Sequence, residues 1–260
     1  MSSSAVSQDT SEPATGSTRS FDGTKIAFDL FHRPSRSVVV VVPGFWRTRR
    51  HPAMQRFASF VNAAGYAAAV CDLRGHGDSE GIFGFNLSEH QDTAAVCEEL
   101  LRSRSYESIT LVGLSYGGAI AISTAARHKL PLASLLLISP VADFSTISPR
   151  INLFTLHRHI ALGQALQRPR FEWRGVRSSP KLRAIDDVAD VHVPICLLHV
   201  KNDWLIDHSH SLALYERANE PKELHVIDIP GNYHADRMFN VAADRVDPII
   251  SAFLECYSPK

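Results

Sequence analysis

A short stretch near the middle of the chain could supply a nucleophile. Residues 113–117 read Gly-Leu-Ser-Tyr-Gly, so that Ser115 stands between two glycines. This pattern is typical of a sharp strand-to-helix turn that exposes a serine hydroxyl. The preceding residues 108–113 predict a strand, and the small residues 119–126 predict a helix. This context favours a reactive Ser115 over a surface serine in an ordinary glycine-rich turn.

Two further residues could activate this serine. A serine hydroxyl is a weak nucleophile, so a histidine must accept its proton and an acid must hold the histidine in the right tautomer. Asp203 closely follows the predicted strand 195–200, and His234 follows the last predicted strand, 223–229, which gives the expected order of serine, acid and histidine. Asp207 is the alternative acid. Its position before a predicted helix suits the helix dipole better, so we favour Asp203.

Acyl transfer also requires two backbone N–H groups that bind the developing oxyanion. One donor is expected at Tyr116, directly after the serine and at the start of the predicted helix. The other is expected in the loop after the buried strand 38–42, most simply at Phe45. The next residue, Trp46, is predicted to contact substrate.

The composition is that of an ordinary globular protein. The 260 residues are 45% hydrophobic and 21% charged, and basic and acidic residues balance at 27 each, so we expect one core and no nucleic-acid partner. No run of about 18 apolar residues predicts a transmembrane helix. The four cysteines are far apart and form no CxxC pair, which fits a reducing, cytoplasmic compartment. No metal or cofactor is expected, because the chain has no HExxH motif and no Cys/His quartet.

The chain divides into a tail and one domain. Residues 1–20 are rich in Ser and Thr and lack the apolar segment of a secretory signal, so we predict a disordered tail. Residues 21–260 alternate β-branched runs with helix-like stretches, which predicts a mostly parallel sheet with helices on both faces. An Asp-Gly turn at 22–23 predicts a hairpin that leads into the strand 25–31.

The chain resembles the α/β-hydrolases over nearly all of residues 21–253. The serine turn, the strand followed by Asp203, and residues 72–79 (Asp-Leu-Arg-Gly-His-Gly-Asp-Ser) match that family. The closest likeness is to its serine-aminopeptidase-like group, which includes monoacylglycerol lipases and cinnamoyl or feruloyl esterases. The resemblance implies an eight-stranded α/β-hydrolase fold and a structural rather than catalytic role for His76. One departure is Pro43, which stands where that group usually has histidine.

The resemblance also implies a cap formed by an insert, here at about residues 144–190. Residues 144–183 contain eight basic side chains and one acid, and such asymmetry could concentrate an anionic substrate. The alternative is a solvated surface or a contact between the subunits of a homodimer. The cap residues predicted to bind substrate are Arg168, Arg170 and Arg174. Three arginines after the oxyanion loop could extend this basic patch: Arg47, Arg49 and Arg50.

Three functions remain open at this point. The first is hydrolysis of a small-molecule carboxylic ester through an acyl-enzyme, and the second applies the same triad to a thioester or transfers the acyl group to an acceptor other than water. The third is a non-catalytic binding module, which would not need a complete triad. Haloalkane dehalogenase and epoxide hydrolase chemistry is disfavoured because those relatives carry an aspartate at the position of Ser115. We therefore predict a serine hydrolase.

Overall fold

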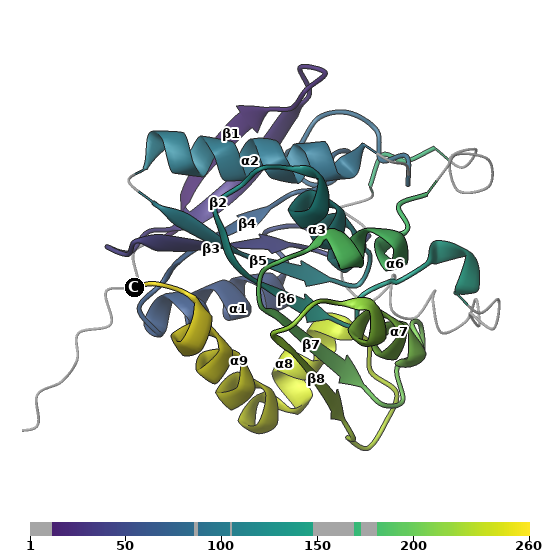
Figure 1. Ribbon diagram of the computed structural model, residues 1–260. Coiled ribbons are helices and arrows are strands. Elements are labelled where there is room, and N and C mark those ends of the chain that lie inside the picture. Colours follow the sequence, from purple (N-terminus) through teal and green to yellow (C-terminus); the bar gives the residue numbers. More distant parts are fainter. Residues whose placement is uncertain (1–11, 86–87, 105, 148–168, 173–180) are drawn as a thin grey trace, which may run out of the picture.

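One eight-stranded sheet runs through the molecule (Figure 1). The computed structural model describes residues 12–85, 88–104, 106–147, 169–172 and 181–260. In sheet order, the strands are β1 (Ala14–Arg19), β2 (Lys25–Phe31), β4 (Ala67–Cys71), β3 (Ser37–Val42), β5 (Ser108–Leu114), β6 (Leu132–Ile138), β7 (Ile195–Val200) and β8 (Lys222–Ile227). The β1–β2 and β2–β4 pairs are antiparallel and the other five pairs are parallel. The prediction of a mostly parallel eight-stranded sheet is confirmed.

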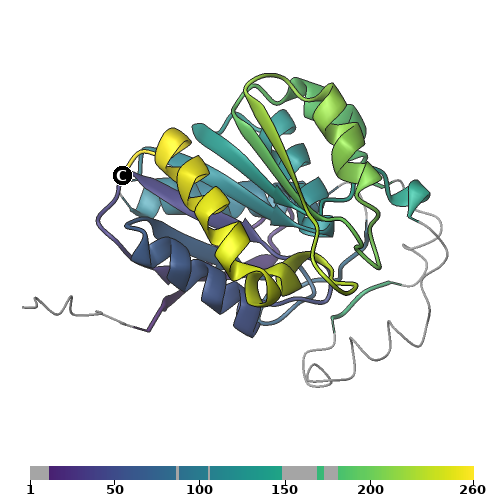
Figure 2. The ribbon, with the colours of Figure 1, turned by 90° about the horizontal axis from the view of Figure 1, so that it is seen from below.

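Helices cover both faces of this sheet (Figures 1 and 2). One face is covered by α1 (Pro52–Ala63), α8 (Met238–Val241) and α9 (Ala243–Tyr257). The other is covered by α2 (Glu89–Ser103), α3 (Tyr116–Arg127), α6 (Ala184–Asp187) and α7 (Ser209–Arg217). Short 3-10 turns lie at η1 (Phe144–Thr146), η2 (Val188–Asp190) and η3 (Ala235–Arg237). None of the helices in the described part of the chain has the length and apolar character needed to cross a membrane.

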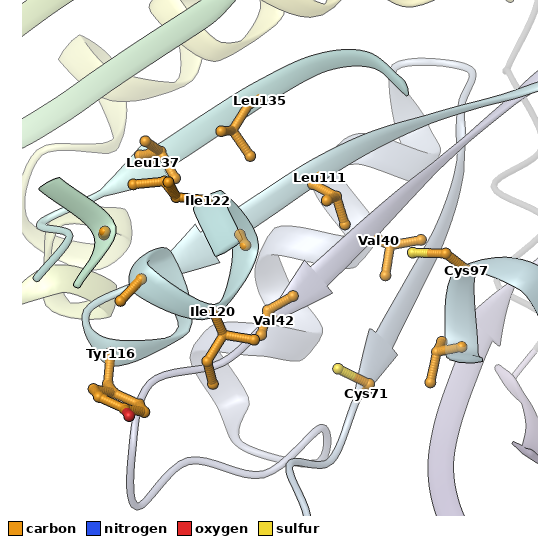
Figure 3. Packing of buried hydrophobic residues seen from close by; sticks show 14 of the residues in the cluster. Val40, Val42, Cys71, Cys97, Leu111, Tyr116, Ile120, Ile122, Leu135 and Leu137 are labelled. Carbon is orange, nitrogen blue, oxygen red and sulfur yellow. The ribbon is translucent and has the colours of Figure 1, made fainter. Parts of the chain in front are cut away.

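Strand β3 shows why both faces must be covered. Its side chains alternate, so that Val38, Val40 and Val42 join the core under α2 and α3. Val39 and Val41 join the core under α1 and α9. All five valines are fully buried, and Figure 3 shows Val40 and Val42 among side chains of α3 and the neighbouring strands. An unbroken valine run therefore fits only a strand that has helices on both sides.

The order of the strands creates a crevice at one end of the sheet. Strand β3 has β4 on one side and β5 on the other, so the connections that follow β3 and β5 leave in opposite directions. In open α/β sheets, ligands bind at such a switch point, beyond the carboxyl ends of the strands. The loop after β3 and the turn after β5 therefore meet at this end.

The predicted tail over residues 1–20 is wrong at its C-terminal end. Residues 14–19 form β1, which pairs with β2 from Ala14 opposite Leu30 to Arg19 opposite Lys25. β1 is an edge strand and its side chains are mostly exposed, so its sequence carries no hydrophobic periodicity. Backbone pairing, which composition does not reveal, holds it in place. Residues 1–11 lie outside the described part of the chain.

A buried arginine ties the segment after β3 to the sheet. Arg49 is 1% exposed, and its guanidinium donates to Asp29 of β2 at 2.8 Å, to Asp78 at 2.6 Å and to Asp72. The backbone N–H of Arg49 also donates to Asp72, at 2.7 Å. Because a buried charge is costly unless it is paired, this cluster fixes the course of the chain between β3 and α1.

We predict that Arg49→Met lowers the free energy of unfolding by about 3–5 kcal/mol, because it leaves the buried carboxylates of Asp29 and Asp72 without their partner. Arg50→Met is the matched control. Its side chain is 58% exposed and pairs with Asp78 at 3.0 Å, so its loss should cost about 1 kcal/mol or less. Urea titration of both variants measures the difference. Equal losses would contradict the role of the Arg49 cluster.

Candidate active site

Ser115 lies at a strained turn between β5 and α3. Its φ is 54° and its ψ is −123°, a conformation that non-glycine residues seldom adopt. The neighbouring backbone holds it there: the N–H of Ser115 donates to the carbonyl of Ile138 at 2.9 Å. The carbonyl of Ser115 accepts from the N–H groups of Gly118, at 2.9 Å, and Val141, at 3.2 Å. Such strain persists only where surrounding structure enforces it, and it is frequent at functional sites.

Gly117 allows the turn to lie close to the end of β3. A side chain at this position would collide with the backbone carbonyl oxygens of Val42 and Pro43. The first turn of α3 therefore packs directly on the loop that leaves β3. This contact explains the second glycine of the serine motif and places Ser115 next to that loop.

The three residues predicted as a triad lie together. His234 Nε2 is 2.8 Å from Ser115 Oγ, and His234 Nδ1 is 2.9 and 2.7 Å from the two carboxylate oxygens of Asp203. The Nδ1–H donates to the carboxylate, which leaves the Nε2 lone pair to accept the serine hydroxyl proton. The Asp203 side chain is fully buried, whereas that of His234 is 12% exposed. Ser115 itself is half-buried, so a ligand can reach it.

The rival acid, Asp207, has a different task. It accepts the N–H of Ser209 at 2.9 Å at the start of α7, and its side chain is 68% exposed. Asp203 instead accepts two backbone N–H groups of its own loop, at 2.9 and 3.0 Å. Burial alone would raise the pKa of Asp203, but its attraction to His234 and its hydrogen bonds outweigh burial and lower that pKa. Asp203 is therefore an ionised acceptor beside the histidine.

Sequence reasoning did not identify one residue that supports Asp203 from behind. His199 is fully buried; its Nε2–H donates to the carbonyl of Ile206 at 2.9 Å, and its Nδ1 accepts the hydroxyl of Ser211 at 2.7 Å. The N–H of Ile206 in turn binds the Asp203 carboxylate. Burial lowers the pKa of His199 to about 4, so the ring stays neutral and supports the acid loop. The one sequence feature that could have identified His199 is that it is the single strongly polar side chain in the otherwise apolar strand β7.

The two predicted oxyanion donors belong to segments that lie next to Ser115. Gly44 begins a turn closed by the Arg47 N–H donating to the Gly44 carbonyl at 3.1 Å, and a Cβ on Gly44 would lie 3.0 Å from the Cβ of Ser115. The next N–H, that of Phe45, has no acceptor among the described residues. Tyr116 opens α3, and the first N–H groups of a helix lack intrahelical acceptors. Pro43 is thus compatible with a loop that reaches the serine.

Trp46 lies in the same turn and belongs to an aromatic cluster. The backbone N–H of Trp46 donates to His76 Nε2 at 3.2 Å. The Trp46 ring centroid is 5.3 Å from that of Phe45 and 5.9 Å from that of Phe171. Trp204, which was not predicted, brings its ring within 6.2 Å of the His234 ring. The aromatic cluster consists of Phe45, Trp46, Phe83, Phe85, Tyr116, Phe144 and Phe171.

Of the three cap arginines predicted to bind substrate, Arg170 is the one that lies within the described residues. Arg168 and Arg174 lie outside the described residues. The Arg170 guanidinium donates to the carbonyl of Ser79 and lines a cavity of about 620 Å³ with Lys25 and Glu80, and no triad residue lines that cavity. The structure therefore does not bring Arg170 to Ser115.

The three arginines expected to extend the basic patch each pair with an aspartate. Arg47 pairs with Asp236 at 3.3 Å, Arg50 pairs with Asp78, and Arg49 is buried among carboxylates. Burial removes Arg49 from any such patch, whereas the Arg50 side chain is 58% exposed.

Potential metal ligands gather at one place in the described chain, away from these loops. Cys196 and Glu223 face each other across β7 and β8, and His225 follows on β8. Burial raises the pKa of the Cys196 thiol, and His225 Nε2 already pairs with Glu223 at 2.8 Å. A protonated thiol is a poor ligand, so this group has little capacity to hold a metal ion.

The sheet order, the strained serine after β5 and the acid after β7 define an α/β-hydrolase fold. The chain belongs to the family described as serine aminopeptidase, S33, whose profile matches residues 33–179. It is thus a member of a hydrolase family. No match was found among curated proteins.

Solved structures share this fold. Esterase Pf2001 of Pyrococcus furiosus superposes with a TM-score of 0.76 at 20% identity, covering 95% of this chain and 91% of that one. The α/β hydrolase GrgF of Penicillium sp. sh18 has a TM-score of 0.78 at 18% identity, covering 94% and 96%. Esterase RhEst1 of Rhodococcus sp. ECU1013 has a TM-score of 0.70 at 18% identity, covering 94% and 99%. At these identities the likeness concerns the fold.

We predict that Asp203→Asn slows labelling of Ser115 by a fluorophosphonate by roughly 10²–10⁴-fold, because an amide stabilises the wrong histidine tautomer and cannot balance an imidazolium. Asp207→Asn should label at nearly the wild-type rate, since Asp207 only caps α7. Labelling rates measured by intact-protein mass spectrometry separate the two variants. A larger effect at position 207 would assign the acid to Asp207.

Proposed function

We propose that this protein is a serine hydrolase that cleaves a carboxylic ester through an acyl-enzyme. One observation carries the proposal: a continuous relay from the buried Asp203 carboxylate through His234 to the Ser115 hydroxyl, with contacts of 2.7 and 2.8 Å. A binding module would not need this alignment. The relay removes the serine proton at the moment of attack, which a serine alone cannot do at neutral pH.

In the first half of the proposed reaction, Ser115 Oγ bonds to the ester carbonyl carbon while His234 Nε2 takes the hydroxyl proton. The carbonyl oxygen becomes an oxyanion that the N–H groups of Phe45 and Tyr116 bind. The C–O bond to the alcohol then breaks, and His234 returns the proton to the leaving oxygen. Asp203 stays ionised throughout and stabilises the positively charged imidazole.

In the second half, water repeats the sequence. His234 takes a proton from the water as its oxygen bonds to the acyl carbon, and a second oxyanion forms between the same two N–H groups. When the ester bond to Ser115 breaks, His234 returns the proton to the serine oxygen. The products are a carboxylic acid and an alcohol, and the enzyme is unchanged.

The surroundings of the donors favour an apolar ester. The rings of Phe45 and Tyr116 both belong to the aromatic cluster, and the Phe45 centroid is 4.4 Å from that of Phe85 and 5.3 Å from that of Phe83. Among the partly exposed rings of this cluster, those of Phe45 and Trp46 would therefore give the reacting carbonyl apolar walls, which bind alkyl or aryl groups by excluding water. Several structures of this fold carry the name esterase, which agrees with an ester substrate. The family name instead suggests aminoacyl substrates.

We predict that the protein hydrolyses p-nitrophenyl esters and that Ser115→Ala lowers kcat by roughly 10³–10⁶-fold, because a triad acts as a unit. Ser103→Ala, a change at an exposed serine of α2, should leave kcat and the melting temperature unchanged. A panel of p-nitrophenyl esters, methyl ferulate, acyl-CoAs and leucine p-nitroanilide identifies the bond that is cleaved. A preference for acyl-CoA would replace ester by thioester, one for the anilide would favour a peptidase, and equal activity of Ser115→Ala would contradict the proposal.

A further inference from the structure

The oxyanion turn contains a residue in a costly conformation. Trp46 has a φ of 71°, although it is neither glycine nor asparagine. Such a residue is strained and persists only when its surroundings enforce it. Rotation of the peptide between Phe45 and Trp46 would relieve this φ and convert the turn from type II to type I. It would also redirect the Trp46 N–H.

His76 holds the Trp46 N–H in the observed direction. His76 Nδ1 lies 3.0 Å from the carbonyl oxygen of Arg74, which can only accept, so Nδ1 carries the proton. Nε2 therefore has a free lone pair, and it accepts the N–H of Trp46 at 3.2 Å. The two contacts require the same neutral tautomer and are mutually consistent.

The ring of His76 is firmly fixed. It is 1% exposed and packs edge-on against Phe45, with centroids 5.5 Å apart, and against Phe83, at 5.0 Å. Burial lowers the pKa of His76 to about 4, so the neutral acceptor form is present at neutral pH. The side chain can neither rotate away from Trp46 nor exchange its acceptor for a donor under those conditions.

We infer that His76 is a positioning residue for the oxyanion hole, which holds the turn that presents the Phe45 N–H to the reacting carbonyl. The inference rests on the proposed function. His76 does not touch substrate; it acts by preserving the strained peptide that follows Phe45. This assigns a role in the reaction to a residue of the 74–77 turn that the sequence indicated to be purely structural.

A second contact limits how far the turn can move without His76. The Arg47 guanidinium pairs with Asp236 at 3.3 Å, two residues beyond His234. The end of the turn therefore stays near the histidine loop even when the Trp46 N–H is released. Loss of His76 should remove the hydrogen bond that fixes the turn, so that the turn and the Phe45 N–H that it carries can shift without leaving the site. Substrate binding should then be affected less than transition-state stabilisation.

The test compares His76→Phe and His76→Gln. Phenylalanine keeps the aromatic packing and removes the acceptor, while the glutamine amide oxygen can take the place of Nε2. We expect His76→Phe to lower kcat for a p-nitrophenyl ester about 10- to 100-fold, less than the loss of an entire oxyanion donor, with KM changed less than about 3-fold. His76→Gln should regain most of kcat. His90→Gln, at a buried histidine of α2 that pairs with His128, is the matched control and should retain kcat.

An inhibitor series separates positioning from general support of the fold. An alkyl boronic acid forms a tetrahedral adduct on the serine, so its inhibition constant should weaken in His76→Phe by the same factor as kcat/KM falls. The binding of the carboxylic acid product should change little. Melting temperatures of all variants reveal any loss of folded protein.

Two results would overturn the inference. One is a His76→Phe enzyme with wild-type kcat and wild-type boronate inhibition. The other is a His76→Phe enzyme in which kcat falls but boronate inhibition is unchanged. If instead the wild-type protein showed no turnover that depends on Ser115, the proposed function would fail first and this inference with it. Turnover that depends on Ser115 but not on His76 would remove the inference alone.

Discussion

The close approach of Gly117 to the end of β3 determines where the reactive groups lie. Because the first turn of α3 rests on the carbonyls of Val42 and Pro43, the serine turn and the loop after β3 occupy one place at the end of the sheet. The N–H of Tyr116 and the turn that contains Phe45 thereby both lie close to Ser115. Asp203 and His234 could not meet a serine that stood elsewhere, since both reach Ser115 from the ends of more distant strands.

This arrangement concentrates backbone strain at the carboxyl ends of the strands. Every non-glycine residue with positive φ in the described ranges lies in a segment that follows β3, β4, β5, β6 or β8. These residues are Trp46, Phe85, Ser115, Ser139 and Ala235. Each costs about 1–3 kcal/mol, so the two cores on either face of the sheet must stabilise the fold enough to hold them. The regular part of the molecule can thus be understood as support for a strained edge.

The parts of the structure that could be predicted from the sequence are those that depend on a few neighbouring residues. The valine run of β3, the glycine spacing around Ser115 and the position of Asp203 after an apolar strand are all short-range signals. Parallel strands then bring such loops to one edge, which is why a triad spread over 119 residues could be recognised. Strand β1 could not be recognised, because an exposed edge strand depends on pairing with β2 rather than on its own apolar pattern.

Charge counts along the sequence give less information about a binding site. A count of charges along residues 144–183 or around Arg47 cannot show which aspartate each arginine will meet. Asp236 is 189 residues from Arg47, and Asp72 is 23 residues from Arg49. Burial favours such pairing, because an unpaired guanidinium in the interior is far more costly than a paired one. Basic residues in loops close to a core are therefore weak evidence for an anionic ligand.

The three histidines near the site also differ in their burial and in their hydrogen-bond partners. His76 and His199 are buried and their pKa values are lowered to about 4, so both serve as neutral hydrogen-bonding groups. His234 is the one of the three that joins an ionised carboxylate to the serine hydroxyl. The His234 ring therefore has a carboxylate beside it that would stabilise an added proton, whereas the other two rings keep fixed tautomers. The difference between the ring that joins Asp203 to Ser115 and the two rings that bind only neutral loop or side-chain atoms follows from burial and from partners, which thirteen histidines in a sequence do not display.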